Sequence, residues 1–218
     1  MSRFQTRQCT DLSCRLRFPI AAGSTLGDRC PHCDAKTQTV DLTYSTDSAK
    51  DLRDRPPGPA LEVLLDNIRS LRNVGAILRS ADGVGVQHVH IGGFTPPPDH
   101  AKMAKTALGA ELSLNWTRHR DSLQAATALR ERGVELWALE GGARSIPLFS
   151  APLPPPQNTL CLLLGHEVSG IDPRLLDLCT QVVRIPMLGI KGSLNVAVAF
   201  GIAAYAIRFD LRTRPCVP

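Results

Sequence analysis

Short apolar runs alternate with stretches of helical spacing along the chain after residue 60. Apolar runs of this length are typical of buried strands, whereas apolar residues three and four positions apart indicate one face of a helix. The runs predict strands at 61–65, 86–91, 112–116, 134–139, 160–164 and 182–185. The helical spacing predicts helices at 73–84, 101–107, 122–132, 173–179 and 194–209, and a proline-rich surface loop at 147–156. The alternation predicts an α/β fold in which helices cover both faces of a parallel sheet.

The composition changes sharply at residues 53–59. This segment reads RDRPPGP, and its prolines neither continue a helix nor pair within a central strand. We therefore expect a linker at 53–59, a small cysteine-containing module at 1–52 and a larger domain at 60–214.

The overall composition is that of a globular protein. Of the 218 residues, 43% are hydrophobic, which is enough for one packed domain with a small appendage. The polar start of the chain does not resemble a signal peptide. The longest apolar stretches are shorter than the roughly 20 residues that cross a bilayer. We expect a cytoplasmic protein without membrane contact, and the formal net charge of +5 favours a polyanionic partner.

Four of the seven cysteines form two close pairs near the start of the chain. Cys9 and Cys14 are one pair, and Cys30 and Cys33 are the other, with 15 residues between the pairs. Two such turns can bring four thiolates around Zn²⁺ in a tetrahedron. A module this poor in apolar residues needs a bound metal or a cross-link to stabilise its fold. Two disulfides, or cysteines with no joint role, are the alternatives, but the odd cysteine count and the missing secretion signal favour zinc in a reducing compartment. His32, inside the second turn, is expected to be a bystander.

Basic side chains surround these cysteines. A zinc ion with four thiolates carries a net charge of about −2, so a basic rim suits contacts with nucleic-acid phosphates. A purely structural cap or a protein-docking ribbon is the alternative. The basic residues of this rim are Arg3, Arg7, Arg15, Arg17, Arg29 and Lys36.

The first of three notable segments follows the predicted strand 61–65. A polar loop leads to Asn73, which is predicted to cap a helix, and Gly75 permits close backbone approach. Arg79 lies further along the same helix. Taken alone, Arg79 is better explained by a surface position in which its guanidinium reaches an exposed carboxylate.

The other two segments are loops rich in glycine. Strand 160–164 ends in a loop that holds Glu167 between Gly165 and Gly170, at the end of a strand where α/β sheets bind ligands. The loop at 186–192 precedes a helix whose first turn carries Ser193 and Asn195. The alternative for this turn is that Ser193 caps the helix while Asn195 bonds a local carbonyl.

Together these segments resemble a known family. The stretch from Asn73 to Arg79, GHEVSG at 165–170, IPM at 185–187 and SLN at 193–195 follow the order of three family motifs. They are the motifs of the SpoU (TrmH-like) branch of the SPOUT RNA methyltransferases. The resemblance covers about residues 60–209, and KTALGAE at 105–111 is similar to a segment between the first two motifs.

This resemblance implies a deep trefoil knot in the C-terminal third, a homodimer and bound S-adenosylmethionine. A knot is an exception to ordinary chain connections, so the residue pattern alone would not predict it. The implied activity is transfer of a methyl group to a ribose 2′-hydroxyl of tRNA or rRNA. Carried over by position, the cofactor-binding residues are Leu139, Gly165, Ile185, Met187 and Leu194. The implied catalytic residues are Arg79, which engages the attacking hydroxyl, and Asn73, Glu167, Ser193 and Asn195, which shape the site.

The chemistry restricts what Arg79 can do. A methyl group on a sulfonium is already activated, so the enzyme mainly supplies orientation and desolvation. A guanidinium with a pKa above roughly 12 is a poor general base. We therefore expect Arg79 to position the hydroxyl and a neighbouring phosphate and to stabilise the developing alkoxide.

Three other functions compete with this one. An RNA-binding protein without catalysis would keep the glycines but not the polar motif residues, all of which are present here. A Rossmann-type oxidoreductase needs its glycine motif directly after the first strand, whereas GVGV at 83–86 lies between a helix and a strand. A zinc-ribbon adaptor with an incidental α/β domain leaves the three motifs unexplained. The target nucleotide is not encoded in any pattern we can identify.

Overall fold

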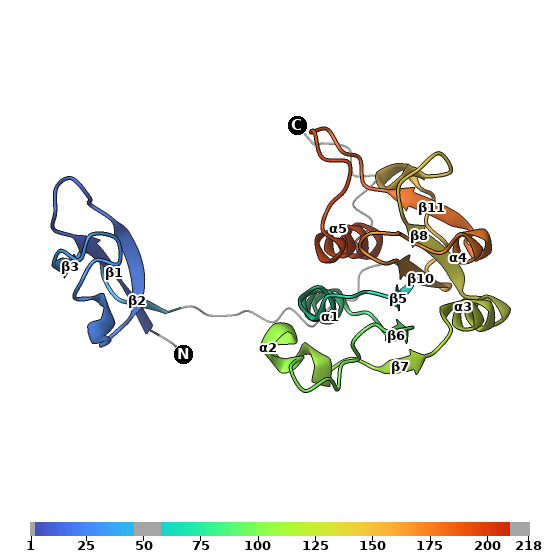
Figure 1. Cartoon of the computed structure of the whole chain (residues 1–218), viewed down its shortest axis with the longest axis horizontal. Helices are drawn as coiled ribbons and strands as arrows, with labels where there is room; N and C mark the ends of the chain where they lie inside the picture. The colour runs from blue at the N-terminus through green and yellow to red at the C-terminus, as the bar shows by residue number, and fades with distance from the viewer. Residues whose placement is uncertain (1–2, 46–57, 210–218) are drawn as a thin grey trace. The chain divides into compact units, whose positions relative to one another are not determined.

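The computed structural model describes residues 3–45 and 58–209 (Figure 1). The chain forms two compact units, Met1–Arg55 and Pro56–Pro218, and each is described by itself. Most of the expected linker at 53–59 and the expected end of the larger domain at 210–214 fall outside the described residues, so the domain boundaries stay predictions. Within the described ranges, no helix is long and apolar enough to cross a membrane.

The smaller unit is an antiparallel sheet with almost no apolar core. Its elements are β1 (Arg3–Cys9), β2 (Arg17–Ala21), the 3-10 turn η1 (Thr25–Gly27), β3 (Thr37–Thr39) and β4 (Tyr44–Ser45). Strand β1 pairs with each of the other three strands. Among residues 3–45, only Cys9, Gly27 and Cys30 are buried. Hydrophobic burial therefore contributes little here, and the unit needs another source of stability.

The larger unit is built on a seven-stranded parallel sheet. Its strands are β5 (Ala60–Asp66), β6 (His88–Gly92), β7 (Trp116–His119), β8 (Glu135–Leu139), β9 (Ile146–Pro147), β10 (Thr159–Leu164) and β11 (Gln181–Arg184). They lie in the order β7-β6-β5-β10-β8-β11-β9, and every neighbouring pair is parallel. The predicted α/β class is confirmed. The trefoil knot stays a prediction, because strand order alone does not show how a chain passes through its own loops.

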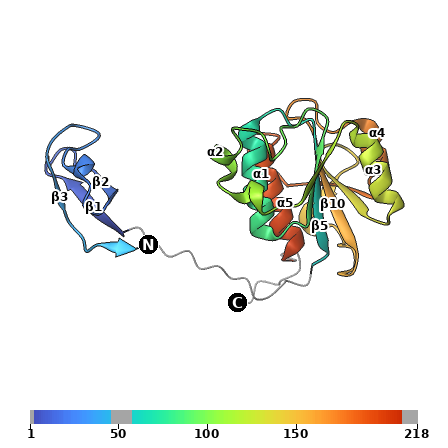
Figure 2. The ribbon, with the colours of Figure 1, turned by 90° about the horizontal axis from the view of Figure 1, so that it is seen from below.

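Two layers of helices cover the sheet (Figure 2). The longer helices α1 (Leu71–Val84) and α5 (Val196–Arg208) lie on one face, and α3 (Ser122–Glu131) and α4 (Pro173–Leu178) lie on the other. Central strand β10 contributes to both cores. Leu160, Leu162 and Leu164 join the α1–α5 core, whereas Cys161 and Leu163 join the α3–α4 core. Burial on both faces explains why this strand is apolar at every position after Thr159.

A close contact joins α1 to the short helix α2 (Ala104–Ala107). A Cβ atom added to Gly75 would lie 2.1 Å from Thr106 Oγ1, a distance no side chain can tolerate. The expected role of Gly75 in close approach is therefore confirmed. This contact fixes the KTALGAE segment against the helix that carries Asn73 and Arg79.

Three expectations from the sequence need correction. The predicted strand at 112–116 is found at Trp116–His119, because residues 110–112 form the 3-10 turn η2 (Ala110–Leu112) after a left-handed Leu108. The proline-rich loop at 147–156 is partly ordered into edge strand β9 and the 3-10 turn η3 (Leu148–Ser150), and Leu148 is fully buried. An edge strand accepts Pro147 because its outer side needs no N–H donor. Helix α1 begins at Leu71, and its cap is Ser70 rather than Asn73.

Candidate functional site

A cavity of about 750 Å³ opens at the carboxyl ends of the central strands of the larger unit. Parallel α/β sheets bind ligands at this edge, and the volume falls in the range of small-molecule sites. Four loops supply its walls, and they follow β5, β8, β10 and β11. The loops after β5, β10 and β11 contain the three segments that the sequence singled out.

The carboxylate of Glu167 connects two of these segments. One oxygen, Oε2, accepts a hydrogen bond from the backbone N–H of Arg69 at 2.9 Å. The other oxygen, Oε1, accepts from the backbone N–H of Ser70 and from Asn73 Nδ2, both at 3.0 Å. These donors lie at the start of α1, where the helix dipole also favours a negative charge.

A second bond extends this network to the third segment. Asn195 Nδ2 donates to Asn73 Oδ1 at 3.1 Å. Asn195 also caps α5, since its Oδ1 accepts from the N–H groups of Ala197 and Val198. The alternative interpretation, in which Ser193 caps this helix, is therefore wrong. Asn73 does not cap α1. It bridges Glu167 and Asn195, which lie 94 and 122 residues further along the chain.

The hydrogen bonds control the charge of Glu167. Its partial burial alone would raise the pKa, but the bonds from the backbone of Arg69 and Ser70 and from the Asn73 side chain outweigh that effect. They hold the pKa at about 2, so the carboxylate is ionised at any pH where the protein is expected to work.

All five predicted cofactor-binding residues line the cavity: Leu139, Gly165, Ile185, Met187 and Leu194. Gly165 permits the tight loop that follows β10, because a Cβ atom there would lie 2.5 Å from the backbone of Gly170. His166 and Gly170 close this loop with two backbone hydrogen bonds of 3.1 and 2.9 Å. The apolar side chains from the other loops can cover the faces of a planar group, while loop amides face its edge.

Four of the predicted catalytic residues also line the cavity, namely Asn73, Glu167, Ser193 and Asn195. Arg79 does not. It is exposed on α1 beyond Asn73, and within residues 3–45 and 58–209 its guanidinium has no ion pair or hydrogen bond. The alternative interpretation, in which a surface carboxylate holds Arg79, has no support among these residues.

The cavity also contains polar residues that the sequence analysis missed. Glu140, Arg69, Ser70 and His166 line it. Glu140 directly follows β8, and its Oε2 accepts a hydrogen bond from the N–H of Ile171 at 3.2 Å. The sequence did contain a signal for Glu140, because a carboxylate that follows a predicted strand and precedes two glycines is typical of a ligand-binding loop.

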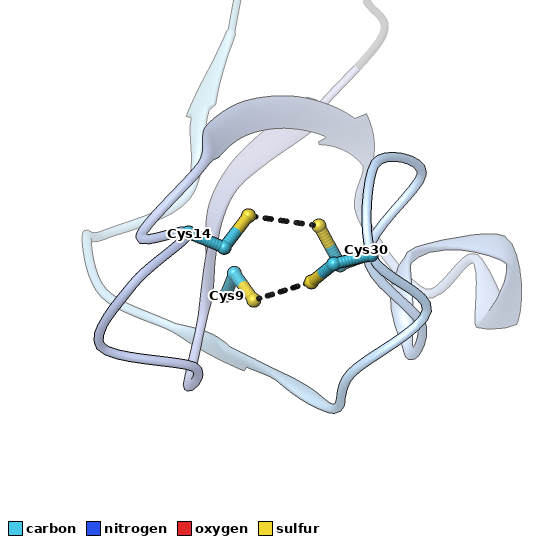
Figure 3. A group of neighbouring side chains, drawn as sticks. Cys9, Cys14 and Cys30 are labelled. Carbon is cyan, nitrogen blue, oxygen red and sulfur yellow. Dashed lines mark hydrogen bonds between the residues drawn. The ribbon is translucent and has the colours of Figure 1, made fainter.

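The four N-terminal cysteines converge in the smaller unit. Figure 3 shows Cys9, Cys14 and Cys30 pointing toward one another. The four sulfur atoms all lie within 4.8 Å of one another, with Cys9 and Cys33 at 3.5 Å and Cys14 and Cys30 at 3.8 Å. None of the six cysteines in the described ranges forms a disulfide. A tetrahedral zinc ion with bonds of about 2.3 Å holds its sulfurs about 3.8 Å apart, so the cluster fits the ion.

The comparison with known proteins decides the family. A model of the SpoU rRNA Methylase family matches residues 60–205. The chain belongs to this SpoU family. Its match covers the sheet, both helical layers and all three segments of the cavity.

Several characterised relatives are similar to this SpoU chain. It is 32% identical over 147 residues to a tRNA (guanosine(18)-2′-O)-methyltransferase of Escherichia coli K12, covering 67% of this chain and 62% of the relative. It is 33% identical over 156 residues to the 23S rRNA (guanosine-2′-O-)-methyltransferase RlmB of Xylella fastidiosa, covering 72% and 61%. The matches thus span less than two thirds of each relative.

A solved structure has the same fold. An AdoMet-bound rRNA methyltransferase from Sinorhizobium meliloti superposes with a TM-score of 0.64 at 27% identity, covering 72% of this chain and 59% of that chain.

The network around Glu167 predicts a pH-dependent contribution to stability. The folded pKa lies below the ordinary value, so the stabilisation is complete above pH 4.5 and is lost as the pH falls toward 2. At pH 7 we expect Glu167→Gln to lower the free energy of unfolding by about 1–2 kcal/mol, since the site is half-exposed. Thermal unfolding measured between pH 3 and pH 7 checks this, with the exposed Glu131→Gln as control. A difference from wild type that stays constant across this range contradicts the assignment.

Proposed function

We propose that this chain transfers a methyl group from S-adenosylmethionine to a ribose 2′-hydroxyl of tRNA or rRNA. The observation that carries the proposal is the hydrogen-bonded unit of Asn73, Glu167 and Asn195 at the cavity. It joins three segments that the family resemblance assigns to one active site. The relatives named above act on tRNA and on 23S rRNA, and the Sinorhizobium structure holds AdoMet, which supports this substrate class and methyl donor.

The residues of the cavity fit S-adenosylmethionine. The apolar side chains of Leu139, Ile185, Met187 and Leu194 suit the faces of an adenine ring. The carboxylate of Glu140 is an acceptor for ribose hydroxyls or an amino group. When bound, the cofactor supplies an electrophilic methyl group. The protein then has to orient the hydroxyl and exclude water.

Within this scheme Asn73, Glu167 and Asn195 hold the three loops together. Ser193 lines the cavity and has no hydrogen-bond partner for its hydroxyl among residues 58–209, so we assign it to the substrate. Arg79 stabilises the alkoxide that develops on the ribose and contacts a neighbouring phosphate. A guanidinium does not accept the proton at neutral pH, so we assign proton removal to solvent.

We also propose that the active enzyme is a knotted homodimer, as the SPOUT resemblance implies. Exposed apolar side chains on α5 support a contact surface there, since Val198, Ile202 and Tyr205 are 51%, 36% and 41% exposed. Helix α5 lies against α1, and Arg79 lies outside its own chain's cavity. A dimer would let Arg79 serve the cavity of a partner chain.

For the smaller unit we propose a structural zinc ion bound by Cys9, Cys14, Cys30 and Cys33. The ion replaces the missing apolar core. Part of the basic rim is neutralised locally, because Arg7, Arg17 and Arg29 form ion pairs with Asp28, Asp41 and Asp34. The side chains of Arg3, Arg15 and Lys36 have no such pair within residues 3–45, and we assign them to RNA phosphates.

Calorimetric titration of S-adenosylmethionine together with methyl-transfer kinetics tests the active-site proposal. We expect about one cofactor per chain in the wild type. Arg79→Lys should bind the cofactor normally, since residue 79 does not line the cavity, but should lose about 100-fold in kcat because lysine lacks the planar fork. The exposed Arg130→Lys on α3 is the control. Near-normal turnover by Arg79→Lys contradicts the assigned role.

Metal analysis of the purified protein tests the zinc proposal. We expect one zinc per chain, and Cys14→Ser or Cys33→Ser should lose it together with the fold of the smaller unit. His32→Gln should retain zinc, although His32 Nδ1 lies 3.6 Å from Cys14 Sγ. A wild-type protein that lacks zinc but folds with two disulfides would refute the site.

A further inference from the structure

Phe94 is an exposed aromatic residue beside the cavity that the proposed chemistry does not use. It lies in the loop after β6, and 58% of its surface is exposed. Exposure alone does not make a binding site, so the case for Phe94 rests on its fixed loop and on its contact with His166, which lines the cavity.

The loop holds Phe94 rigidly. The N–H of Phe94 donates to Asn67 Oδ1 at 3.3 Å, and the N–H of Gly93 donates to the backbone oxygen of His119 at 3.0 Å. Asn67 and Gly93 both adopt left-handed backbone conformations, with φ of 55° and 60°. A Cβ atom on Gly93 would lie 2.0 Å from Asn67 Oδ1, so only glycine fits this turn.

A buried hydroxyl anchors the same loop from below. Thr95 is fully buried, and its Oγ1 donates to the backbone oxygen of Leu65 at 3.0 Å and accepts from the N–H of Ile68 at 2.9 Å. The loops after β5 and β6 are thereby joined directly beneath Phe94. These bonds fix the backbone that carries Phe94, so little backbone ordering has to occur when a ligand binds there.

His166 connects Phe94 to the cavity. Its ring lies 6.0 Å from the ring of Phe94 at 83°, edge to face, and His166 itself lines the cavity. His166 Nδ1 accepts hydrogen bonds from the N–H groups of Val168 and Ser169, both at 3.2 Å. The proton of the neutral ring is therefore on Nε2, which leaves one fixed donor beside the aromatic face.

We infer that Phe94 and His166 form a stacking site for an unpaired nucleobase of the RNA, at the mouth of the cofactor cavity. This inference rests on the proposed function. A ribose that reaches the cavity belongs to a nucleotide outside a helical stack, so its base or a neighbouring base has a free face. Phe94 covers that face, and His166 Nε2–H donates to a base or sugar oxygen.

The charges around this platform suit the same ligand. The side chains of Arg69 and Arg120 are exposed on loops at the same edge of the sheet. Neither guanidinium forms an ion pair within residues 58–209, so both are available to the flanking phosphates.

Methyl-transfer kinetics on Phe94→Ala, Phe94→Leu and Phe94→Trp test the inference, with total tRNA and rRNA as the substrate. Loss of one base stack should raise the KM for RNA about 10- to 100-fold in the alanine and leucine variants. Tryptophan should restore a KM close to wild type, because it keeps an aromatic face. The exposed Phe149→Ala is the matched control and should behave like wild type.

Cofactor titration and thermal unfolding of the same variants separate a loss of RNA binding from a loss of cofactor binding or of stability. The Kd for S-adenosylmethionine and the unfolding temperature should be unchanged in all of them. A leucine variant with wild-type KM, or a tryptophan variant as poor as alanine, overturns the stacking site. A change confined to the oligomeric state would instead identify Phe94 as a protein contact and also overturns it. A wild-type enzyme that transfers no methyl group refutes the proposed function itself.

Discussion

The larger unit depends on one interaction at the carboxyl edge of its sheet, the carboxylate of Glu167 bound by donors at the start of α1. Through Asn73 and Asn195 the same network reaches the cap of α5, so three distant segments share one set of hydrogen bonds. An ionised carboxylate is needed, because a neutral one would accept these bonds more weakly. The family motifs are therefore joined physically as well as by their order in the sequence.

The network lies at the carboxyl edge of the sheet, where two binding surfaces adjoin each other. One is the apolar cavity between the loops after β8, β10 and β11, which suits a nucleoside-like cofactor. The other is the fixed loop that presents Phe94 beside His166. In the proposed reaction the methyl donor and the RNA nucleotide meet at this boundary, and His166 belongs to both surfaces.

Much of this arrangement was predictable from the sequence. The continuous apolar run at 160–164 indicated a strand buried on both faces, and the glycines and polar residues of the three motifs indicated the cavity. The true cap of α1 was missed because Ser70 and Asn73 are both good capping residues, and only the long-range bonds to Glu167 and Asn195 decide between them. Phe94 was missed because a single aromatic residue in a loop carries no periodicity. Its importance depends on Asn67 and Thr95, whose contacts are purely tertiary.

The most direct test of the account is to identify the methylated product. The wild-type protein is incubated with methyl-deuterated S-adenosylmethionine and either tRNA or rRNA, and the digested nucleosides are separated by mass. The account predicts the label on a 2′-O-methylated ribose in one of the two RNA classes. Label on a base, or no label from a protein that binds the cofactor, would contradict it.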